Sequence, residues 1–221
     1  MNTDTRSIAI VDFGMGNLHS VARALAHASP DSHIQITADP AVIQRAARVV
    51  FPGQGAMPDA MRSLAARPGL TEAVLQACQS RPTLGICLGE QMLLDASEEG
   101  TGADGQLTRG LGLLPGRVVR FDPEVMKAAG NLKVPHTGWN RVYPTRPHPL
   151  WAGIEPGAYF YFVHSFYAQP DNPDHRAAYS AYGGDFTCAV TQNNMFAVQF
   201  HPEKSAAAGL RLFRNFTQWR P

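Results

Sequence analysis

The 221-residue sequence lacks the features that mark secreted, membrane and nucleic-acid-binding proteins. Its three cysteines, Cys78, Cys87 and Cys188, are odd in number and have no Cys-x-x-Cys spacing, which argues against a disulfide framework or a zinc site. The 19 basic and 18 acidic residues nearly cancel, so no surface for nucleic acid or anionic membrane is expected. No apolar run approaches the length of a membrane span, and residues 1–6 are polar. We expect a cytoplasmic protein that needs neither a metal nor a cofactor.

Repeats, low-complexity tracts and interdomain linkers are also missing, and 221 residues can bury one sizeable core. In the first half, apolar strand-like runs alternate with helical spacing. Strands are expected at 7–11, 33–37, 48–51 and 82–86, and helices at 18–28, 58–66 and 70–79. Later strand signals at 159–167, 176–181, 186–191 and 195–200 follow one another, before an amphipathic helix at 204–219. This order predicts one α/β domain over residues 1–221: a mostly parallel, helix-covered sheet with an antiparallel extension.

The segment Gly85-Ile86-Cys87-Leu88-Gly89 joins a short buried strand to a helix expected to include Gln91 to Leu94. It has the Gly-x-Ser-x-Gly pattern of a nucleophile elbow, with cysteine in the serine position. Glycines on both sides relieve crowding in the tight turn, and the following helix directs free N–H groups at the sulfur. Both features favour a reactive thiolate. The alternative is that Cys87 is a small core residue, as we expect for Cys78 and Cys188.

A cysteine nucleophile needs a base and a group that orients the base. His201-Pro202-Glu203 offers both, because proline favours extended backbone before it and residues two apart on extended chain face the same side. Imidazole can carry the thiol proton, while a carboxylate fixes its tautomer. The competing interpretation is a strand-end turn with a helix-capping acid. His164, inside an aromatic strand, is more typical of a structural histidine.

Two glycine-containing turns follow other strands. Gly14-x-Gly16 is weak evidence for a dinucleotide site, because His19 replaces the third glycine of that motif and Asp39 is equally typical of a turn or helix cap. Gly53-Gln54-Gly55 can bring backbone N–H groups close to a ligand, or it is an ordinary loop. Residues 97–106 indicate an exposed loop. If the sheet is parallel, the elbow and both turns lie at its carboxyl edge.

Together these motifs resemble the class I, triad-type glutamine amidotransferases over nearly the whole chain. Within that family, the segments similar to the glutaminase subunits of imidazole glycerol phosphate synthase are Pro52-Gly53-Gln54-Gly55, residues 110–121, His136-Thr137-Gly138-Trp139-Asn140, Tyr161-Phe162-Val163-His164-Ser165 and residues 199–205. The resemblance implies hydrolysis of glutamine, with ammonia passed to a TIM-barrel cyclase subunit, the heterodimer partner. That partner makes imidazole glycerol phosphate and aminoimidazole carboxamide ribotide in histidine biosynthesis.

The site that this chemistry requires has two parts. Cys87 attacks the amide carbon, His201 transfers protons, Glu203 orients His201, and the N–H of Leu88 with a donor from Gly53-Gln54-Gly55 stabilises the oxyanion. The resemblance further implies that Gln91 and the backbone at Ser165 and Phe166 hold the amino-acid end of glutamine. Gln54, Phe166 and Thr137 depart from residues common in the family, which affects details at the partner interface and not the reaction.

Three alternatives stay open: a glutaminase subunit of a different synthase, a free-standing hydrolase of γ-glutamyl bonds, and a non-catalytic regulatory subunit. Retention of all three triad residue types argues against the last. Trp139 is an amphipathic side chain of the kind enriched at binding hot spots and could belong to a docking face beside the triad. A buried tryptophan is the competing interpretation.

Overall fold

A nine-stranded mixed sheet organises the computed structural model, which describes residues 5–102 and 105–221. The strand order is β2-β1-β3-β4-β13-β12-β11-β8-β9. Its strands are β1 (Ser7–Val11), β2 (His33–Thr37), β3 (Arg48–Gly53), β4 (Thr83–Cys87), β8 (His136–Pro144), β9 (Ala158–His164), β11 (Arg176–Ala181), β12 (Asp185–Gln192) and β13 (Met195–Val198). Strands β2 to β13 in that order are parallel, and β12, β11, β8 and β9 extend the sheet with antiparallel pairs. The predicted fold class is therefore confirmed.

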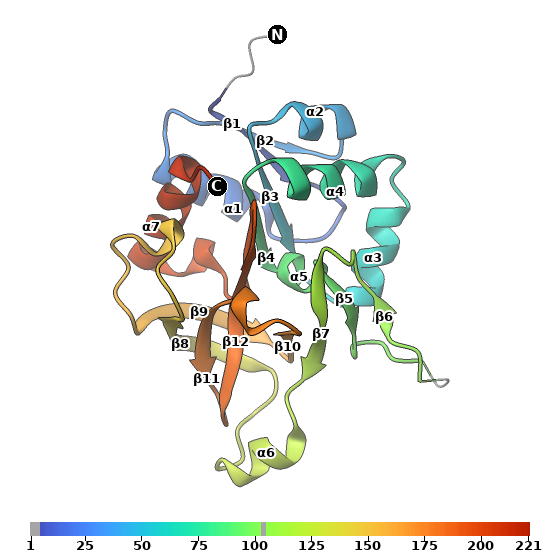
Figure 1. The fold of residues 1–221 in the computed structure, drawn as a ribbon, viewed down its shortest axis with the longest axis vertical. Helices are drawn as coiled ribbons and strands as arrows, with labels where there is room; N and C mark the ends of the chain where they lie inside the picture. The colour runs from blue at the N-terminus through green and yellow to red at the C-terminus, as the bar shows by residue number, and fades with distance from the viewer. Residues whose placement is uncertain (1–4, 103–104) are drawn as a thin grey trace.

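Helices cover both faces of the parallel half (Figure 1). They are α1 (Leu18–Ala28), α2 (Pro40–Arg45), α3 (Met57–Ala65), α4 (Leu70–Ser80) and α7 (Ala206–Gln218). On one face α1 and α7 bury their apolar sides with Val21, Leu25 and Phe213 in one core cluster. On the other, α2, α3 and α4 bury a second cluster that includes Ile43 and Leu64. The sheet is thus buried from both sides, which explains its nearly continuous apolar strands.

A second, four-stranded sheet was not predicted from the sequence. Its order is β10-β7-β5-β6, formed by β10 (Phe166–Pro170), β7 (Leu114–Arg120), β5 (Leu94–Ser97) and β6 (Thr108–Arg109). The expected strand 159–167 is wrong as one unit, because the chain leaves the large sheet after His164 and enters the small one at Phe166. The residue between them, Ser165, is therefore at the junction of the two sheets.

The helix after Cys87 is also shorter than predicted: α5 spans Leu88–Gln91, and Leu94 begins a strand. The reason is tertiary, since the carbonyls of Met92 and Leu93 accept hydrogen bonds from the N–H groups of Leu111 and Leu113 at 2.8 and 2.9 Å. Those carbonyls cannot continue a helical ladder. The elbow therefore carries one helical turn.

Several further expectations can be compared with the structure. The helices at 58–66 and 70–79 are confirmed to within a residue or two, whereas α7 begins only at Ala206, after a 3₁₀ turn, η3 (Pro202–Lys204). The segments α6 (Pro123–Ala128), η1 (Pro149–Trp151) and η2 (Pro173–His175) were not predicted. Residues 1–4 and 103–104, parts of the expected polar start and exposed loop, lie outside the described residues. Within the described part, no helix is long and apolar enough to cross a membrane.

Candidate active site

Cys87 occupies a sharp turn at the carboxyl end of β4. Its backbone has φ 54° and ψ −111°, a conformation that L-residues rarely adopt and that is typical of a nucleophile elbow. A Cβ on Gly89 would overlap the carbonyl of Phe51, so only glycine lets the elbow approach β3 this closely. All three cysteines are free and buried, with Cys87 8% exposed, Cys78 2% and Cys188 0%, and the core positions expected for Cys78 and Cys188 are confirmed. Because α5 is a single turn, its N–H groups act on the sulfur locally rather than through a long helix dipole.

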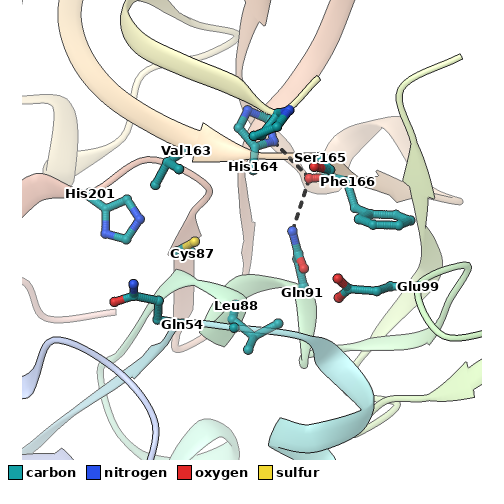
Figure 2. A pocket seen from close by; sticks show the side chains of 12 residues that line it. Gln54, Cys87, Leu88, Gln91, Glu99, Val163, His164, Ser165, Phe166 and His201 are labelled. Atoms are coloured by element: carbon teal, nitrogen blue, oxygen red, sulfur yellow. Dashed lines mark hydrogen bonds between the residues drawn. The ribbon is translucent and has the colours of Figure 1, made fainter. Parts of the chain in front are cut away.

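His201 and Glu203 meet beside this elbow. His201 Nδ1 lies 2.8 Å from Glu203 Oε1, and both side chains are buried. Since an ionised carboxylate only accepts, Nδ1 donates and the other ring nitrogen, Nε2, is left to serve the thiol. Nε2 has no hydrogen-bond partner within the described chain, and the ring lies near the Cys87 sulfur in Figure 2. The prediction that the two side chains converge is confirmed.

The reason for that convergence differs from the expected one. His201 has extended backbone, but Glu203 lies in the 3₁₀ turn η3 rather than on extended chain or in the final helix. Ser205 Oγ donates to the His201 carbonyl at 2.6 Å and accepts from Tyr161 N at 3.0 Å. A Cβ on Gly209 would overlap the Pro202 carbonyl, so α7 packs directly against the turn. The His-Pro-Glu segment is therefore held from β9 and from α7.

The charge state of His201 follows from its neighbours. Burial opposes protonation of the ring, but the Cys87 sulfur and the Glu203 carboxylate outweigh it and raise the pKa of His201 to about 10. At neutral pH the imidazolium form is favoured wherever a thiolate faces it. The arrangement therefore supports a thiolate–imidazolium pair with Glu203 behind the ring.

A cavity of about 240 Å³ opens over Cys87. It is smaller than the roughly 300–1,000 Å³ typical of sites for drug-sized ligands, and so suits a small metabolite. The predicted residues that line it are Gln54, Gly55, Cys87, Leu88, Gln91, Ser165, Phe166 and His201. Two others stand just outside the lining: Gly53 is the register partner of Cys87 on β3, and Glu203 lies behind His201.

The amide of Gln91 is fixed at the cavity wall. Its Nε2 donates to the Phe166 carbonyl at 3.1 Å (Figure 2). It also donates to Gln199 Oε1 at 2.8 Å, and Gln199 Nε2 in turn lies 3.7 Å from Cys87 Sγ. Both N–H groups of the amide are thus used by the protein. The Gln91 oxygen Oε1 is left as the acceptor available to a ligand.

Sequence reasoning missed Glu99, His164, Val163 and Pro135, which also line the cavity. Glu99 Oε2 accepts a hydrogen bond from Met57 N at 2.8 Å, and Figure 2 shows its carboxylate directed toward Gln91. Among the described residues of the lining it is the one carboxylate, so it complements a cationic group. No local motif marks it: it follows β5 inside a segment that reads as an exposed polar loop.

The turn after β1 packs against the loop that follows β3. Gly14 N donates to Asp12 Oδ1 at 2.8 Å, and Gly16 packs close to the Gly53 backbone, so the turn supports the neighbouring loop. Asp39 caps α2 by accepting from Ala41 N, which agrees with the turn-or-cap interpretation. Across residues 5–102 and 105–221, no three His, Cys, Asp or Glu side chains gather as a metal site.

Comparisons with known proteins agree with this geometry. The chain is 55% identical over 216 residues to the imidazole glycerol phosphate synthase subunit HisH of Aromatoleum aromaticum, covering 97% of this chain and 99% of that protein. It is 54% identical to the HisH subunit of Thiobacillus denitrificans, covering 97% and 92%.

Solved structures share the fold at lower identity. One is described as a glutamine amidotransferase, with a TM-score of 0.68, 16% identity, and coverage of 96% of this chain and 97% of that one. Another is a glutamine amidotransferase from Thermotoga maritima, with a TM-score of 0.59, 16% identity, and coverage of 91% and 78%. The family model described as glutamine amidotransferase class-I matches residues 9–219, which includes the elbow, the His-Pro-Glu turn and the cavity between them. The chain belongs to the class I glutamine amidotransferase family.

Proposed function

We propose that this chain hydrolyses the side-chain amide of glutamine and passes the ammonia to the cyclase subunit of imidazole glycerol phosphate synthase, in histidine biosynthesis. The observation that carries the proposal is the meeting of Cys87 at a strained elbow with His201 and Glu203 beside one small cavity. Two relatives, 55% and 54% identical to this chain, are HisH subunits of that synthase. Residues 1–221 act as one domain, and the reaction takes place in the cytoplasm.

The reaction proceeds through a thioester. Cys87 thiolate attacks the amide carbon, and the tetrahedral intermediate collapses when His201 gives its proton to the departing nitrogen, releasing ammonia. His201, now neutral, takes a proton from water, whose oxygen attacks the thioester carbon. Collapse of the second intermediate releases glutamate and the thiolate, and His201 is again the imidazolium. Glu203 holds the ring so that Nε2, not Nδ1, exchanges these protons.

Negative charge develops on the amide oxygen in both tetrahedral intermediates, and backbone N–H groups are its natural partners. Gly53 is paired in register with Cys87, which brings the Gly53-Gln54-Gly55 loop beside Leu88. The N–H of Leu88 and one from this loop form the oxyanion hole of the proposal. Gln54 contributes through its backbone, so its side chain does not decide the chemistry.

The amino-acid end of glutamine binds at the opposite end of the cavity. Gln91 Oε1 and the Glu99 carboxylate accept hydrogen bonds from its α-ammonium group, while the backbone at Ser165 and Phe166 holds the rest of that end. A ligand that lacks the ammonium would cover Glu99 without supplying a counter-charge. Glutamine is therefore favoured over simple amides.

The partner binds an aromatic surface next to the cavity. On one side of the β8–β9 hairpin, the opposed pairs are Thr137 with Val163, Trp139 with Tyr161, and Arg141 with Tyr159. We call these six residues the β8–β9 outer face. Trp139 is 51% exposed and Tyr159 50%, whereas Val163 lines the cavity. Exposed aromatic side chains are enriched in binding hot spots, and this face leads directly to the site of ammonia release.

Glutamate production tests the proposal. The purified chain should hydrolyse glutamine slowly on its own. Hydrolysis should accelerate when the TIM-barrel cyclase and its phosphorylated ligand are added, because the partner favours the active arrangement of the Gly53-Gln54-Gly55 loop. Cys87→Ala should abolish hydrolysis while the thermal unfolding curve changes little. Trp139→Ala should weaken the stimulation, whereas Val125→Ala, an exposed apolar residue on α6, should leave it unchanged.

Four kinds of outcome would contradict the proposal in different ways. Full activity without the cyclase, unchanged on addition, would indicate a free-standing hydrolase. Stimulation by another ammonia-dependent synthase, but not by the cyclase, would change the pathway. Hydrolysis by folded Cys87→Ala would show that Cys87 is not the nucleophile. No hydrolysis by the wild-type chain under any condition would indicate a regulatory role.

A further inference from the structure

Two buried histidines form a hydrogen-bonded pair directly behind the glutamine cavity. His164, at the end of β9, lines the cavity, and its Nδ1 lies 2.8 Å from the Phe166 carbonyl oxygen. His164 Nε2 lies 3.0 Å from Nδ1 of His136, the first residue of β8. His136 Nε2 lies 3.2 Å from Nδ2 of Asn140, which also donates to the Ala181 carbonyl at 2.9 Å. All four imidazole nitrogens therefore have partners.

Only one proton arrangement with neutral rings satisfies this chain of contacts. A carbonyl accepts and cannot donate, so His164 must carry its proton on Nδ1. Its Nε2 is then an acceptor, and His136 must donate from Nδ1. His136 Nε2 is left to accept from Asn140, whose own oxygen accepts from Arg141 N at 2.8 Å, which fixes the orientation of the amide. Both histidines are thus held as the Nδ1–H tautomer.

The surroundings keep both rings neutral. Burial lowers the pKa of His164 to about 3 and that of His136 to about 4. The rings are enclosed by aromatic side chains, with Phe121, Phe162 and Phe186 around the pair. A second proton on either ring would place a donor against a donor, so the arrangement is lost if a ring becomes charged.

The Phe166 carbonyl is where this pair meets the glutamine site. It accepts from His164 Nδ1 on one side and from Gln91 Nε2 on the other. Figure 2 shows both contacts converging on that oxygen. Phe166 also begins β10, where it is the register partner of Arg120 on β7 in the small sheet. The preceding carbonyl, that of Ser165, accepts from Phe121 N at 3.2 Å, and because hydrogen-bonded and non-bonded pairs alternate along antiparallel strands, the Phe166 carbonyl points away from β7. The histidine contact therefore restrains a carbonyl that the pairing with β7 does not bind.

We propose that His164, held in the Nδ1–H tautomer by His136 and Asn140, is a positioning residue for glutamine binding. It fixes the Phe166 carbonyl, which in turn holds the Gln91 amide with Oε1 directed at the substrate. The inference rests on the proposed function, because it assigns the pair to the glutamine site. Packing alone would be served equally well by apolar side chains, which need no partner for four ring nitrogens.

Substitution at His164 separates positioning from packing. His164→Leu removes the donor to Phe166, and the KM for glutamine in the stimulated complex should rise about tenfold with kcat changed much less, as for loss of ground-state binding. His164→Asn keeps an N–H donor near the position of Nδ1 and should restore most of the affinity. His148→Leu is the matched control: this half-buried histidine packs on Phe196 away from the cavity, so KM should stay unchanged even if stability falls.

The tautomer itself can be observed without any turnover. Long-range ¹⁵N–¹H spectra of the wild-type chain should show two of the eight histidines as neutral Nδ1–H rings that do not titrate down to about pH 5. Their signals are assigned by their loss in His164→Asn and His136→Asn. An Nε2–H tautomer at either ring would overturn the inference, and so would an unchanged KM in folded His164→Leu. If His164→Leu fails to fold, the spectra and the His164→Asn kinetics still decide.

Failure of this inference is distinguishable from failure of the proposed function. If the wild-type complex produces no glutamate, the function is wrong whatever the spectra show. If it does produce glutamate, but affinity falls equally in His164→Leu and His164→Asn, the Nδ1 donor is not what matters. Iodoacetamide labelling of Cys87 gives a further check, since its rate should be the same in the wild type and in His164→Leu.

Discussion

Replacement of Glu90 by methionine should stabilise the protein. Glu90 lies in α5, is fully buried, and neither carboxyl oxygen has a hydrogen-bond partner within the described chain. Burial, and then the charge of nearby Cys87, raise the pKa of Glu90 well above its usual value. Cys188 is a second neighbour that offers no positive charge. A carboxyl group in this position therefore costs free energy that an apolar side chain of similar length does not.

The expected gain in the free energy of unfolding has two contributions. An unsatisfied buried polar group costs about 1–3 kcal/mol. Ionisation adds about 1.4 kcal/mol for each unit by which the folded pKa exceeds the unfolded one, up to the working pH. Glu90→Met should therefore raise the free energy of unfolding by about 2 kcal/mol or more at neutral pH. For a chain of this size that corresponds to a rise of roughly 4–8 °C in the melting temperature.

The gain should depend on pH, with a definite sign. The folded pKa of Glu90 is raised, so the unfolded chain releases this proton first, near pH 4.3, whereas the folded chain retains it. Between the two pKa values the wild type loses stability as the pH rises. Glu90→Met lacks this loss, so its advantage should be smallest near pH 4, where only the cost of the unpaired neutral carboxyl group remains, and should grow toward neutrality.

Urea unfolding at about pH 4.5, 6 and 7.5 measures the effect. Glu90→Gln removes the charge but keeps an unpaired polar group, so it should abolish the growth with pH and gain less at neutral pH than methionine. Glu72→Met, at an exposed position of α4, is the matched control and should change the free energy of unfolding by less than about 0.5 kcal/mol. A wild type as stable as Glu90→Met at pH 7.5 would refute the reasoning.

Two further predictions concern the triad and the elbow. His201→Ala should lose nearly all hydrolysis, while Glu203→Gln keeps a measurable part, because it removes orientation and charge but not the proton carrier; equally small losses in both would indicate a structural turn. Gly89→Ala should destabilise the chain by about 3 kcal/mol or more, since its Cβ would lie 2.9 Å from the Phe51 carbonyl carbon. Thermal unfolding measures this loss, and an unchanged melting temperature would show that β3 can shift to make room for the Cβ.

The parts of the fold predicted from sequence are those set by local pattern. Alternating apolar strands and amphipathic helices identify the parallel half, and β1, α1 and β2 have the expected bounds. The glycines at 85 and 89 mark the elbow because the approach to β3 leaves no room for a side chain. Such signals depend on residues near one another in the chain.

The parts that could not be predicted depend on distant contacts. In the small sheet, Leu94 pairs with Leu114 in parallel and Phe166 pairs with Arg120. Neither pairing can be recognised from the sequence pattern of the two segments that form it. The helix expected through Leu94 fails for the same reason. Glu99 became a cavity residue only because the small sheet holds its loop against Met57.

The triad shows how both kinds of information combine. Cys87 and His201 are far apart in the chain, yet β13 pairs with β4 in parallel, with Val198 opposite Ile86. Parallel neighbours end at the same edge of a sheet, so the residues that follow each strand must meet there. Strand β13 reaches this position only by following β12, its antiparallel neighbour. The antiparallel extension is therefore what returns the chain to the elbow, and it places the base beside the nucleophile without any contact that is local in sequence.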